Sequence, residues 1–398
     1  MSTKKTSALV PKLRFPEFRD HDGWEVKPFQ KLFTIGSGRD YKHLSNGSVP
    51  VYGSGGYMLS VDDFLYDGES VCIGRKGTIN NPMFLTGKFW TVDTLFYTHT
   101  FQQCLPKFVY AIFQKIDWLK HNEAGGIPSL SKAIIEKIQT AVPEISEQQK
   151  IADCLSSLDE LIAAQARKVD ALKTHKKGLM QQLFPREGET QPRLRFPEFR
   201  GAGDWVPTTI GAIGSFYYGK SAPKWSLEES AATPCVRYGE LYTKFGALIT
   251  ETYSKTNIDP KNLRFSKGGE ILVPRVGEKP EDFGKNCSYL PIKNIAIGEM
   301  ISVFETKQNP LFFTHYFRNM YRQFAAVVEG QNVKNLYYTE LEPLAISHPI
   351  LDEQQRIADC LTSLDTLITA ATQELETLKI HKKGLMQQLF PSAQAVEV

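Results

Sequence analysis

The sequence predicts an α+β protein in which two mixed α/β globular domains alternate with two long helices that pair as an antiparallel coiled coil. Three observations support this pseudo-twofold tandem repeat. Residues 11–19 return as residues 192–200 with eight of nine positions identical. Residues 147–185 return as residues 353–391 with 27 of 39 positions identical. Both copies of this longer segment carry apolar residues at three-four spacing, which is typical of a coiled-coil seam.

The two long helices are predicted from that seam. Its apolar residues are Ile151, Leu155, Leu158, Ile162, Val169 and Leu172 in the first copy and Ile357, Leu361, Leu364, Ile368, Leu375 and Leu378 in the second. Pro185 and Pro391 end the helices. Gly178 and Gly384 stand inside the pattern, at a cost of about 1 kcal/mol each relative to Ala. They indicate either close backbone packing or a weak last turn. The seams can pair within one chain or between chains.

The segments between the repeated pieces differ from each other and have the pattern of mixed globular domains. Short β-type runs, Gly-rich turns and helical stretches alternate in both. The β-type runs cover residues 49–52, 71–73, 94–97 and 271–273, and the helical stretches cover residues 106–119 and 312–324. We therefore expect a first globular domain over residues 1–145, a first helix over 146–185, a linker and second globular domain over 186–350, and a second helix with a tail over 351–398.

Composition limits the class of protein. The chain has 398 residues, 41% hydrophobic and 23% charged, which excludes a disordered or collagen-like chain and predicts two or three domains. The net charge of +3 is too small to argue for or against nucleic acid. Six cysteines without a Cys-x-x-Cys pair disfavour a zinc ribbon or a redox pair. No membrane span or secretory signal is evident, so we expect a cytoplasmic protein with reduced thiols.

Several short motifs accompany the repeats. Leu-Arg-Phe-Pro-Glu-Phe, Glu-Gln-Gln-Lys/Arg-Ile-Ala, Gly-Arg-Lys-Gly-Thr and Pro-Cys-Val-Arg-Tyr-Gly stand at residues 13–18 and 194–199, 147–152 and 353–358, 74–78, and 234–239, respectively. Together with the alternating layout, these motifs make essentially the whole chain resemble the specificity (S) subunit of type I restriction-modification systems. The motif that opens each long helix is the most specific of them.

This resemblance implies a non-catalytic DNA sequence-recognition subunit. Each globular domain would be a target recognition domain that reads one half of a bipartite double-stranded DNA target. The helices would set the spacer between the halves and dock two methyltransferase (M) subunits, and restriction (R) subunits would join the complex. Methylation and ATP-dependent cleavage are expected from these partners. S-adenosylmethionine, ATP and magnesium are accordingly expected there, and no cofactor, metal or membrane is expected for this chain.

Candidates for DNA contact are loop residues with cationic or hydrogen-bonding side chains. Arg commonly reads guanine and Asn or Gln reads adenine, while Lys adds phosphate contacts. The candidates are Arg39, Lys42, His43, Arg75, Lys76, Thr78, Ser129, Lys132, Lys220, Lys224, Arg237, Tyr238, Arg275, Asn332 and Lys334. A solvated loop charge is the alternative for each. The turns at residues 129–132 and 331–335 are expected to open short helices, whose amides could hold a phosphate or simply be capped.

Two other classes of function stay open as alternatives. One is a stand-alone DNA methyltransferase or nuclease with duplicated DNA-binding domains. Asn-Asn-Pro-Met at residues 80–83 lacks the second Pro and the aromatic residue of an amino-methyltransferase motif, and the carboxylates around Glu270 and Glu278 have no clear metal-ligand spacing. The other is a coiled-coil scaffold with two protein-binding heads, which the motifs of the repeats disfavour.

Overall fold

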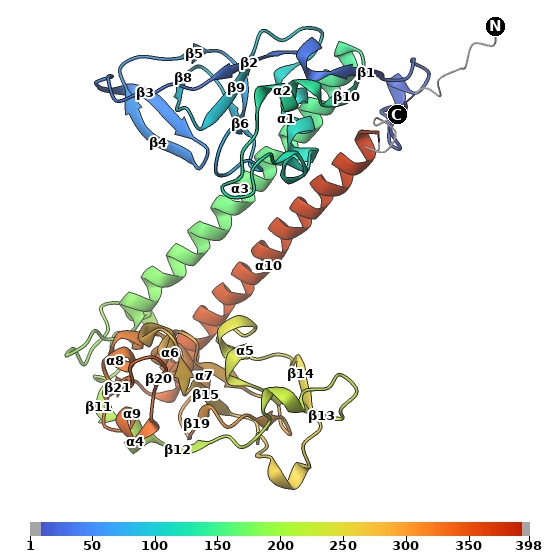
Figure 1. Ribbon diagram of the computed structural model, residues 1–398. Coiled ribbons are helices and arrows are strands. Elements are labelled where there is room, and N and C mark those ends of the chain that lie inside the picture. Colours follow the sequence, from blue (N-terminus) through green and yellow to red (C-terminus); the bar gives the residue numbers. More distant parts are fainter. Residues whose placement is uncertain (1–8, 392–398) are drawn as a thin grey trace, which may run out of the picture. The chain divides into compact units, whose positions relative to one another are not determined.

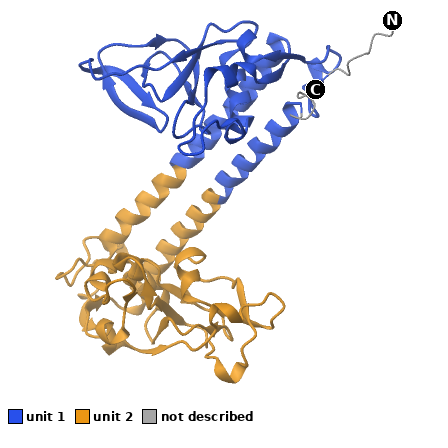
Figure 2. Cartoon of the chain, in the orientation of Figure 1, with its two compact units in different colours: residues 1–167, 373–398 blue, residues 168–372 orange. Residues whose placement is uncertain are grey.

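The computed structural model describes residues 9–391 (Figure 1). The outermost residues of the first and last expected regions lie outside this range. The chain divides into two compact units (Figure 2). Unit 1 comprises residues 1–167 and 373–398, and unit 2 comprises residues 168–372. Each unit therefore takes its globular part from one continuous segment and completes it with a piece of the other long helix.

The globular part of unit 1 is mixed α/β. Its strands are β1 (Glu25–Pro28), β2 (Thr34–Ser37), β3 (Asn46–Gly53), β4 (Gly56–Val61), β5 (Tyr66–Asp67), β6 (Ser70–Gly74), β7 (Met83–Leu85), β8 (Lys88–Thr91), β9 (Leu95–His99) and β10 (Gln139–Val142), and its short helices are α1 (Pro106–Lys115) and α2 (Lys132–Lys137). The strands form three sheets in the orders β2-β9-β6-β7, β4-β3-β8-β5 and β1-β10.

The globular part of unit 2 is built from more pieces. Its strands are β11 (Val206–Thr209), β12 (Gly214–Tyr218), β13 (Thr233–Val236), β14 (Ser254–Thr256), β15 (Glu270–Pro274), β16 (Val276–Gly277), β17 (Ser288–Leu290), β18 (Ala296–Ile297), β19 (Ile301–Thr306), β20 (Lys334–Asn335) and β21 (Ala345–His348). Its short helices are α4 (Ile210–Ile213), α5 (Tyr238–Thr243), α6 (Pro280–Lys285), α7 (Pro310–Asn319), α8 (Tyr321–Ala326) and α9 (Tyr338–Leu341).

The two globular parts share one topology despite their dissimilar sequences. The sheet order β12-β19-β15-β17 in unit 2 matches β2-β9-β6-β7 in unit 1. The order β14-β13-β18 likewise matches β4-β3-β8, and in both sheets the second pair is parallel. Strands β6 and β15 are buried along their whole length, which explains why their continuous apolar runs were recognisable in the sequence.

The expected helical stretches are shorter than the sequence pattern indicated. The stretch at residues 106–119 gives α1, which ends at Lys115, after which the buried Trp118 begins a separate short turn. The stretch at residues 312–324 is divided at Met320 into α7 and α8. In both cases the segment after the helix end packs into the same core. Its buried aromatic residues therefore continue the apolar pattern of the sequence beyond the helix.

The two long helices are α3 (Ile145–Leu183) and α10 (Leu351–Leu389). All twelve expected seam residues are buried or half-buried. In unit 1, Ile151 and Leu155 near the start of α3 share a core cluster with Leu389 at the end of α10. In unit 2, Leu183 at the end of α3 shares a cluster with Ile357 near the start of α10.

Polar contacts also join the first half of one long helix to the second half of the other within each unit. In unit 1, Lys382 of α10 donates to Asp159 of α3 at 2.6 Å. In unit 2, Lys176 of α3 donates to Asp365 of α10 at 2.5 Å. Both lysines occupy apolar seam positions in the three-four pattern. Each is 206 residues from its counterpart, as the sequence repeat requires.

The short repeated peptide, residues 11–19 and 192–200, is held against the long helix that begins in the same unit's globular part by a buried ion pair. Arg14 donates through two nitrogens to Glu147 at 2.9 and 2.7 Å, and the Trp24 indole donates to the same carboxylate at 3.3 Å. Arg195 and Trp205 make the same bonds to Glu353 in unit 2. Because Glu147 and Glu353 are 1% or less exposed, removing either arginine would leave an uncompensated buried charge. The two matching peptides in the sequence therefore have a structural role: each binds the start of a long helix through this ion pair. We call these contacts the clamps on Glu147 and Glu353.

Two remaining expectations concern membranes and cysteines. No helix within residues 9–391 has the length and apolarity needed to cross a membrane. The six cysteines all fall within the described residues, and each has a free thiol.

Candidate nucleic-acid interface

A short segment between two strands organises the candidate residues of unit 1. Residues 92–94 connect β8, which ends at Thr91, to β9. The Arg39 amide donates to Thr91 O at 2.8 Å, and the Arg75 amide donates to Thr94 O at 2.8 Å. Both arginines are exposed. Two exposed cationic residues from separate parts of the sequence are therefore anchored at the two ends of the short β8–β9 connection.

Other candidates of unit 1 lie around this connection. Lys42 and His43 follow Arg39 and are exposed, and the His43 ring lies 5.8 Å from the Trp90 ring. Lys76 forms a strand-like bridge with Ser129. Thr78 is exposed in the turn after Lys76.

The turn at residues 129–132 begins differently from the expectation. It does precede a helix, α2, but the N-cap is Ser131, whose hydroxyl accepts from the Ile134 amide at 3.3 Å. Lys132 is the first helical residue. Ser129 is engaged instead by Lys76, and so belongs with the Arg75 turn rather than with the helix.

Unit 2 presents an equivalent arrangement. Residues 298–300 connect β18, which ends at Ile297, to β19. The Lys220 amide donates to Ile297 O at 2.8 Å, and the Arg275 amide donates to Met300 O at 3.0 Å. The Leu336 amide donates to Arg275 O at 2.9 Å, just as the Leu130 amide donates to Arg75 O at 2.9 Å in unit 1. Lys220 thus corresponds to Arg39, and Arg275 corresponds to Arg75.

The Arg275 side chain is the most closely held of these cations. Its guanidinium lies over the Tyr218 ring at 4.4 Å and near the Tyr337 ring at 5.5 Å. Its Nε is buried without a hydrogen-bond partner, which is a costly state for a charged group. Stacking on two rings limits the guanidinium to few orientations. Such an orientation is suited to bidentate contact with a base edge or a phosphate.

The remaining cationic candidates of unit 2 surround a strained loop. Ser221 and Ala222 have φ values of 62° and 55°, in the left-handed region that side chains other than glycine rarely adopt. The Arg237 Nε donates to Ala222 O at 3.2 Å and helps to fix this loop. Lys224 is exposed. The strain lies next to candidate residues, as is common at functional loops.

Three candidates have other environments than the sequence indicated. Tyr238 is half-buried and packs against a hydrophobic cluster of unit 2. The turn at residues 331–335 does not open a helix. Lys334 and Asn335 form β20 and pair with Gly277 and Val276 of β16, because the backbone there is extended. Asn332 is exposed just before this pair.

Two exposed aromatic residues lie outside the candidates selected from the sequence. Trp225 is 76% exposed beside Lys224, and Tyr57 is 62% exposed in the β3–β4 hairpin. Single exposed apolar side chains are common on protein surfaces, so Trp225 is notable only because it lies next to the candidate Lys224. For Trp225, the flanking Pro-Lys and Ser were the available signal of a surface turn. The exposure of Tyr57 disfavours a place in the core.

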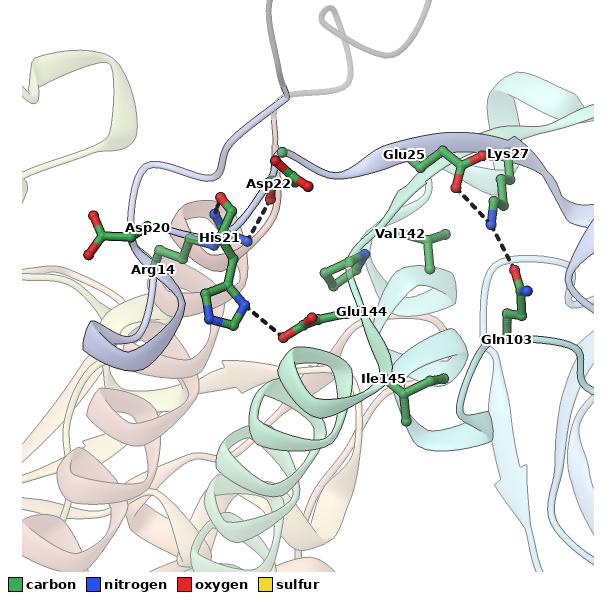
Figure 3. A pocket seen from close by; sticks show the side chains of 12 residues that line it. Arg14, Asp20, His21, Asp22, Glu25, Lys27, Gln103, Val142, Glu144 and Ile145 are labelled. Carbon is green, nitrogen blue, oxygen red and sulfur yellow. Dashed lines mark hydrogen bonds and ion pairs between the residues drawn. The ribbon is translucent and has the colours of Figure 1, made fainter.

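A hollow of unit 1 has a different chemistry. A pocket of about 680 Å³ is lined by Asp20, Asp22, Glu25 and Glu144 among others. Its polar groups satisfy one another: His21 Nδ1 lies 2.8 Å from Glu144 Oε1, and Lys27 lies 2.9 Å from Glu25 and 3.0 Å from Gln103 (Figure 3). A wall with several carboxylates repels DNA phosphates, so this pocket is a poor nucleic-acid site.

Of the carboxylates considered for nuclease chemistry, Glu270 has a structural task, and Glu278 is exposed. Glu270 is 1% exposed and accepts hydrogen bonds from the amides of Lys267 and Gly268, closing the turn before β15. Among residues 9–391 there is no group of three or more His, Cys, Asp or Glu side chains that could hold a metal ion.

The fold and these surfaces define a class of protein: a tandem recognition protein with two similarly built heads on repeated helices. The chain belongs to the family described as Type I restriction modification DNA specificity domain, whose model matches residues 21–174 and 202–379. The resemblance found in the sequence is thereby confirmed, as is the predicted role as a DNA-specificity subunit whose catalysis belongs to partner subunits.

Individual relatives support the same assignment. The type I restriction enzyme MjaVIII specificity subunit of Methanocaldococcus jannaschii is 26% identical over 346 residues, which are 82% of this chain and 77% of that protein. The crystal structure of a type I restriction-modification S subunit from M. genitalium has a similar fold, with a TM-score of 0.66 and 15% identity over 96% of this chain and 100% of the other.

A second solved structure also shares the fold. It comes from a study of complex assembly and conformational transition of the type I restriction-modification system. Its TM-score is 0.53, with 15% identity over 93% of this chain and 98% of the other chain. The tandem two-domain architecture predicted from the sequence is therefore the architecture of known S subunits.

Proposed function

We propose that the globular parts of units 1 and 2 are target recognition domains that each read one half of a bipartite double-stranded DNA target. The observation that carries this proposal is the paired position of four cations. Arg39 and Lys220, and likewise Arg75 and Arg275, have the same backbone anchors in two heads of dissimilar sequence. A common frame with different side chains around it is what two readers of different half-sites require.

The four cations are proposed to have two kinds of task. Exposed Arg39 and Lys220 would contact phosphates, which fix register but carry no sequence information. Arg275, held between aromatic rings, would read a base edge, where a good bidentate pair discriminates by roughly 1–3 kcal/mol. Arg75 would do the same in unit 1, where its guanidinium lies 6.0 Å from the Phe96 ring. The other candidate residues form the surroundings of these contacts.

We also propose that α3 and α10 pair as an antiparallel coiled coil within one chain. Support comes from the contacts inside each unit: the start of α3 contacts the end of α10 in unit 1, and the end of α3 contacts the start of α10 in unit 2. A helix of 39 residues is about 58 Å long at ~1.5 Å per residue. A pair of that length could separate two heads by the ~34–36 Å of one DNA turn.

Two methyltransferase subunits are proposed to dock on equivalent faces of these helices. Gly178 and Gly384 have open space where a Cβ would stand, so no packing among the described residues requires glycine there. Exposed His175 and Gln181 flank Gly178, and identical residues flank Gly384. A repeated glycine without an internal reason, at a cost of about 1 kcal/mol, fits close approach by a partner helix.

The remaining features of the complex are proposals by analogy with its family. Restriction subunits would bind through the assembled complex. S-adenosylmethionine, ATP and magnesium would belong to the partner subunits, and the complex would work in the cytoplasm. The four regions proposed from the sequence correspond to the two recognition domains and the two spacer helices.

One experiment tests the proposed function as a whole. The chain is co-purified with its methyltransferase subunit, and methylated adenines are mapped across the host genome. The expected result is methylation at one bipartite motif, only when both proteins are present. An unmethylated genome, or methylation by this chain alone, would overturn the proposal and favour the stand-alone enzyme.

A further inference from the structure

A basic pocket lies in unit 2, where the two long helices meet the short helices of the globular part. It has a volume of about 330 Å³ and combines residues of α3 and α10 with residues from α6 and α7. The ionisable side chains that line it, apart from Tyr321, are Lys173, Lys176, Lys177, Lys285, Arg318 and Asp365. Five cations face one carboxylate, a formal excess of 5 − 1 = 4 positive charges.

The single carboxylate of this pocket is already engaged. Asp365 pairs with Lys176, whose side chain is only 13% exposed. Arg318 is half-buried, and its one hydrogen bond among the described residues runs from Nη1 to Cys287 O at 2.8 Å. Burial lowers the pKa of both Lys176 and Arg318. Two desolvated cations therefore share one acid, and the guanidinium has donors to spare.

The repeated frame provides an internal comparison. Lys382 in unit 1 corresponds to Lys176, and it is bound by Asp159 at 2.6 Å and by Gln114 Oε1 at 3.0 Å. Gln114 is the ninth residue of α1, and Arg318 is the ninth residue of α7. The cluster of unit 1 is neutral, whereas that of unit 2 carries one extra positive charge. The extra charge of Arg318 is thus not needed to hold the helices together.

A neighbouring histidine is also left without a partner. His315 of α7 is fully buried, and neither of its ring nitrogens has a hydrogen bond. Burial, together with the charges of Lys176 and Arg318, holds its pKa well below the usual value. The corresponding residue of α1 is Ala111. A neutral His315 therefore adds no further positive charge beside Lys176 and Arg318.

We infer that this pocket binds a phosphate group, with Arg318, Lys177 and Lys285 as its principal ligands. A guanidinium offers a planar fork to phosphate oxygens, and lysines add point charges. Lys285 lies 4.7 Å from the centre of the Tyr321 ring and 4.0 Å from Asp282, so it is tethered at the pocket without a tight ion pair. The volume of about 330 Å³ has room for inorganic phosphate or pyrophosphate.

The test is an isothermal titration of the full chain with pyrophosphate, and separately with inorganic phosphate, in buffer free of other phosphate or sulfate. We expect one saturable site. Arg318→Gln, which copies Gln114 of unit 1, should weaken pyrophosphate binding at least tenfold. Lys285→Gln, at a half-exposed side chain, should weaken it severalfold and serves as a second variant with little risk to folding. Thermal melting confirms that each variant remains folded.

A matched control lies on the other helix. Lys383 of α10 corresponds to Lys177 of α3, so Lys177→Gln should weaken pyrophosphate binding while Lys383→Gln leaves it unchanged. The inference is overturned if no saturable binding occurs, if Lys383→Gln has the same effect, or if Arg318→Gln and Lys285→Gln both bind normally. Weaker assembly of Arg318→Gln with the methyltransferase, without any phosphate binding, would also overturn it and favour an acidic protein contact.

The source of the phosphate is decided by adding target duplex to the chain loaded with pyrophosphate. Displacement by duplex, together with weaker duplex binding by Arg318→Gln, identifies a DNA backbone phosphate. Simultaneous binding of duplex and pyrophosphate identifies a free phosphate compound. Both outcomes support the pocket. Because the first titration contains no DNA, its result is independent of whether the heads read DNA as proposed.

Discussion

At the scale of single residues, the correspondence of Arg75 with Arg275 could not be found in the sequence. Lys220 follows Arg39 by 181 residues, Arg275 follows Arg75 by 200, and Met300 follows Thr94 by 206. Insertions shift the alignment twice between these points. The backbone hydrogen bonds identify the pairs directly. Sequence reasoning could select Gly- and Pro-flanked cations, but it could not distinguish the held guanidinium of Arg275 from solvated loop charges.

Arg275→Ala should relax recognition at one position of one half-site. We expect methylation of the target by the complex to fall about 5- to 150-fold, in line with roughly 1–3 kcal/mol for a bidentate base contact, while the other half-site is read normally. Methylation rates on a panel of duplexes with single substitutions check this. Lys307→Ala is the control, because Lys307 follows the opposite end of β19 from Met300. Equal losses in both variants would contradict the assignment.

At the scale of elements, the long helices were predictable because one apolar residue per turn is enough to define a seam. The apolar pattern did not explain why lysines stand at two positions of the seam. Lys176 and Lys382 are accommodated because each reaches a carboxylate of the other helix. The short elements were less predictable. Lys334 and Asn335 form a strand because β16 is available as a partner. This is a tertiary condition that local sequence does not reveal.

Lys382→Asp should destabilise unit 1 by placing two carboxylates together in the seam. We expect a loss of about 1–3 kcal/mol in the free energy of unfolding, between the values for exposed and buried pairs, because the Asp159 side chain is 45% exposed. Adding Asp159→Lys should restore most of the stability by reversing the pair. Adding Asp365→Lys, the equivalent change in unit 2, should not. Denaturant unfolding of the set measures the coupling, and rescue by both lysines would contradict the pairing.

At the scale of the whole molecule, duplication was the firmest prediction from the sequence, and the shared topology of the two heads was hidden by their divergence. The identical frame is explained by contacts that recur in both units, such as the clamps on Glu147 and Glu353. The heads have no such constraint on their loops. Selection on the frame and freedom in the loops together account for near-identical helices beside dissimilar domains.

Lengthening both helices should change the spacer of the DNA target without changing the bases read. Four residues inserted after Val169 in α3 and after Leu375 in α10 add about one turn, or ~6 Å at ~1.5 Å per residue. With ~3.4 Å per base pair, the spacer should grow by about one or two base pairs. Coiled coils tolerate such a stutter by local unwinding. Methylation mapping of the variant complex checks this, and an unchanged spacer at full activity would show that the helices do not set the distance.

The central claim is that each head reads one half of the target independently on a shared frame. Its most direct test replaces residues 15–145 with the corresponding head of a related S subunit and maps methylated adenines for the chimaeric and parental complexes side by side. The account predicts that one half-site changes to that of the donor, while the other half-site and the spacer length stay as in the parent. A change in both half-sites together, in a chimaera that still methylates DNA, would contradict it.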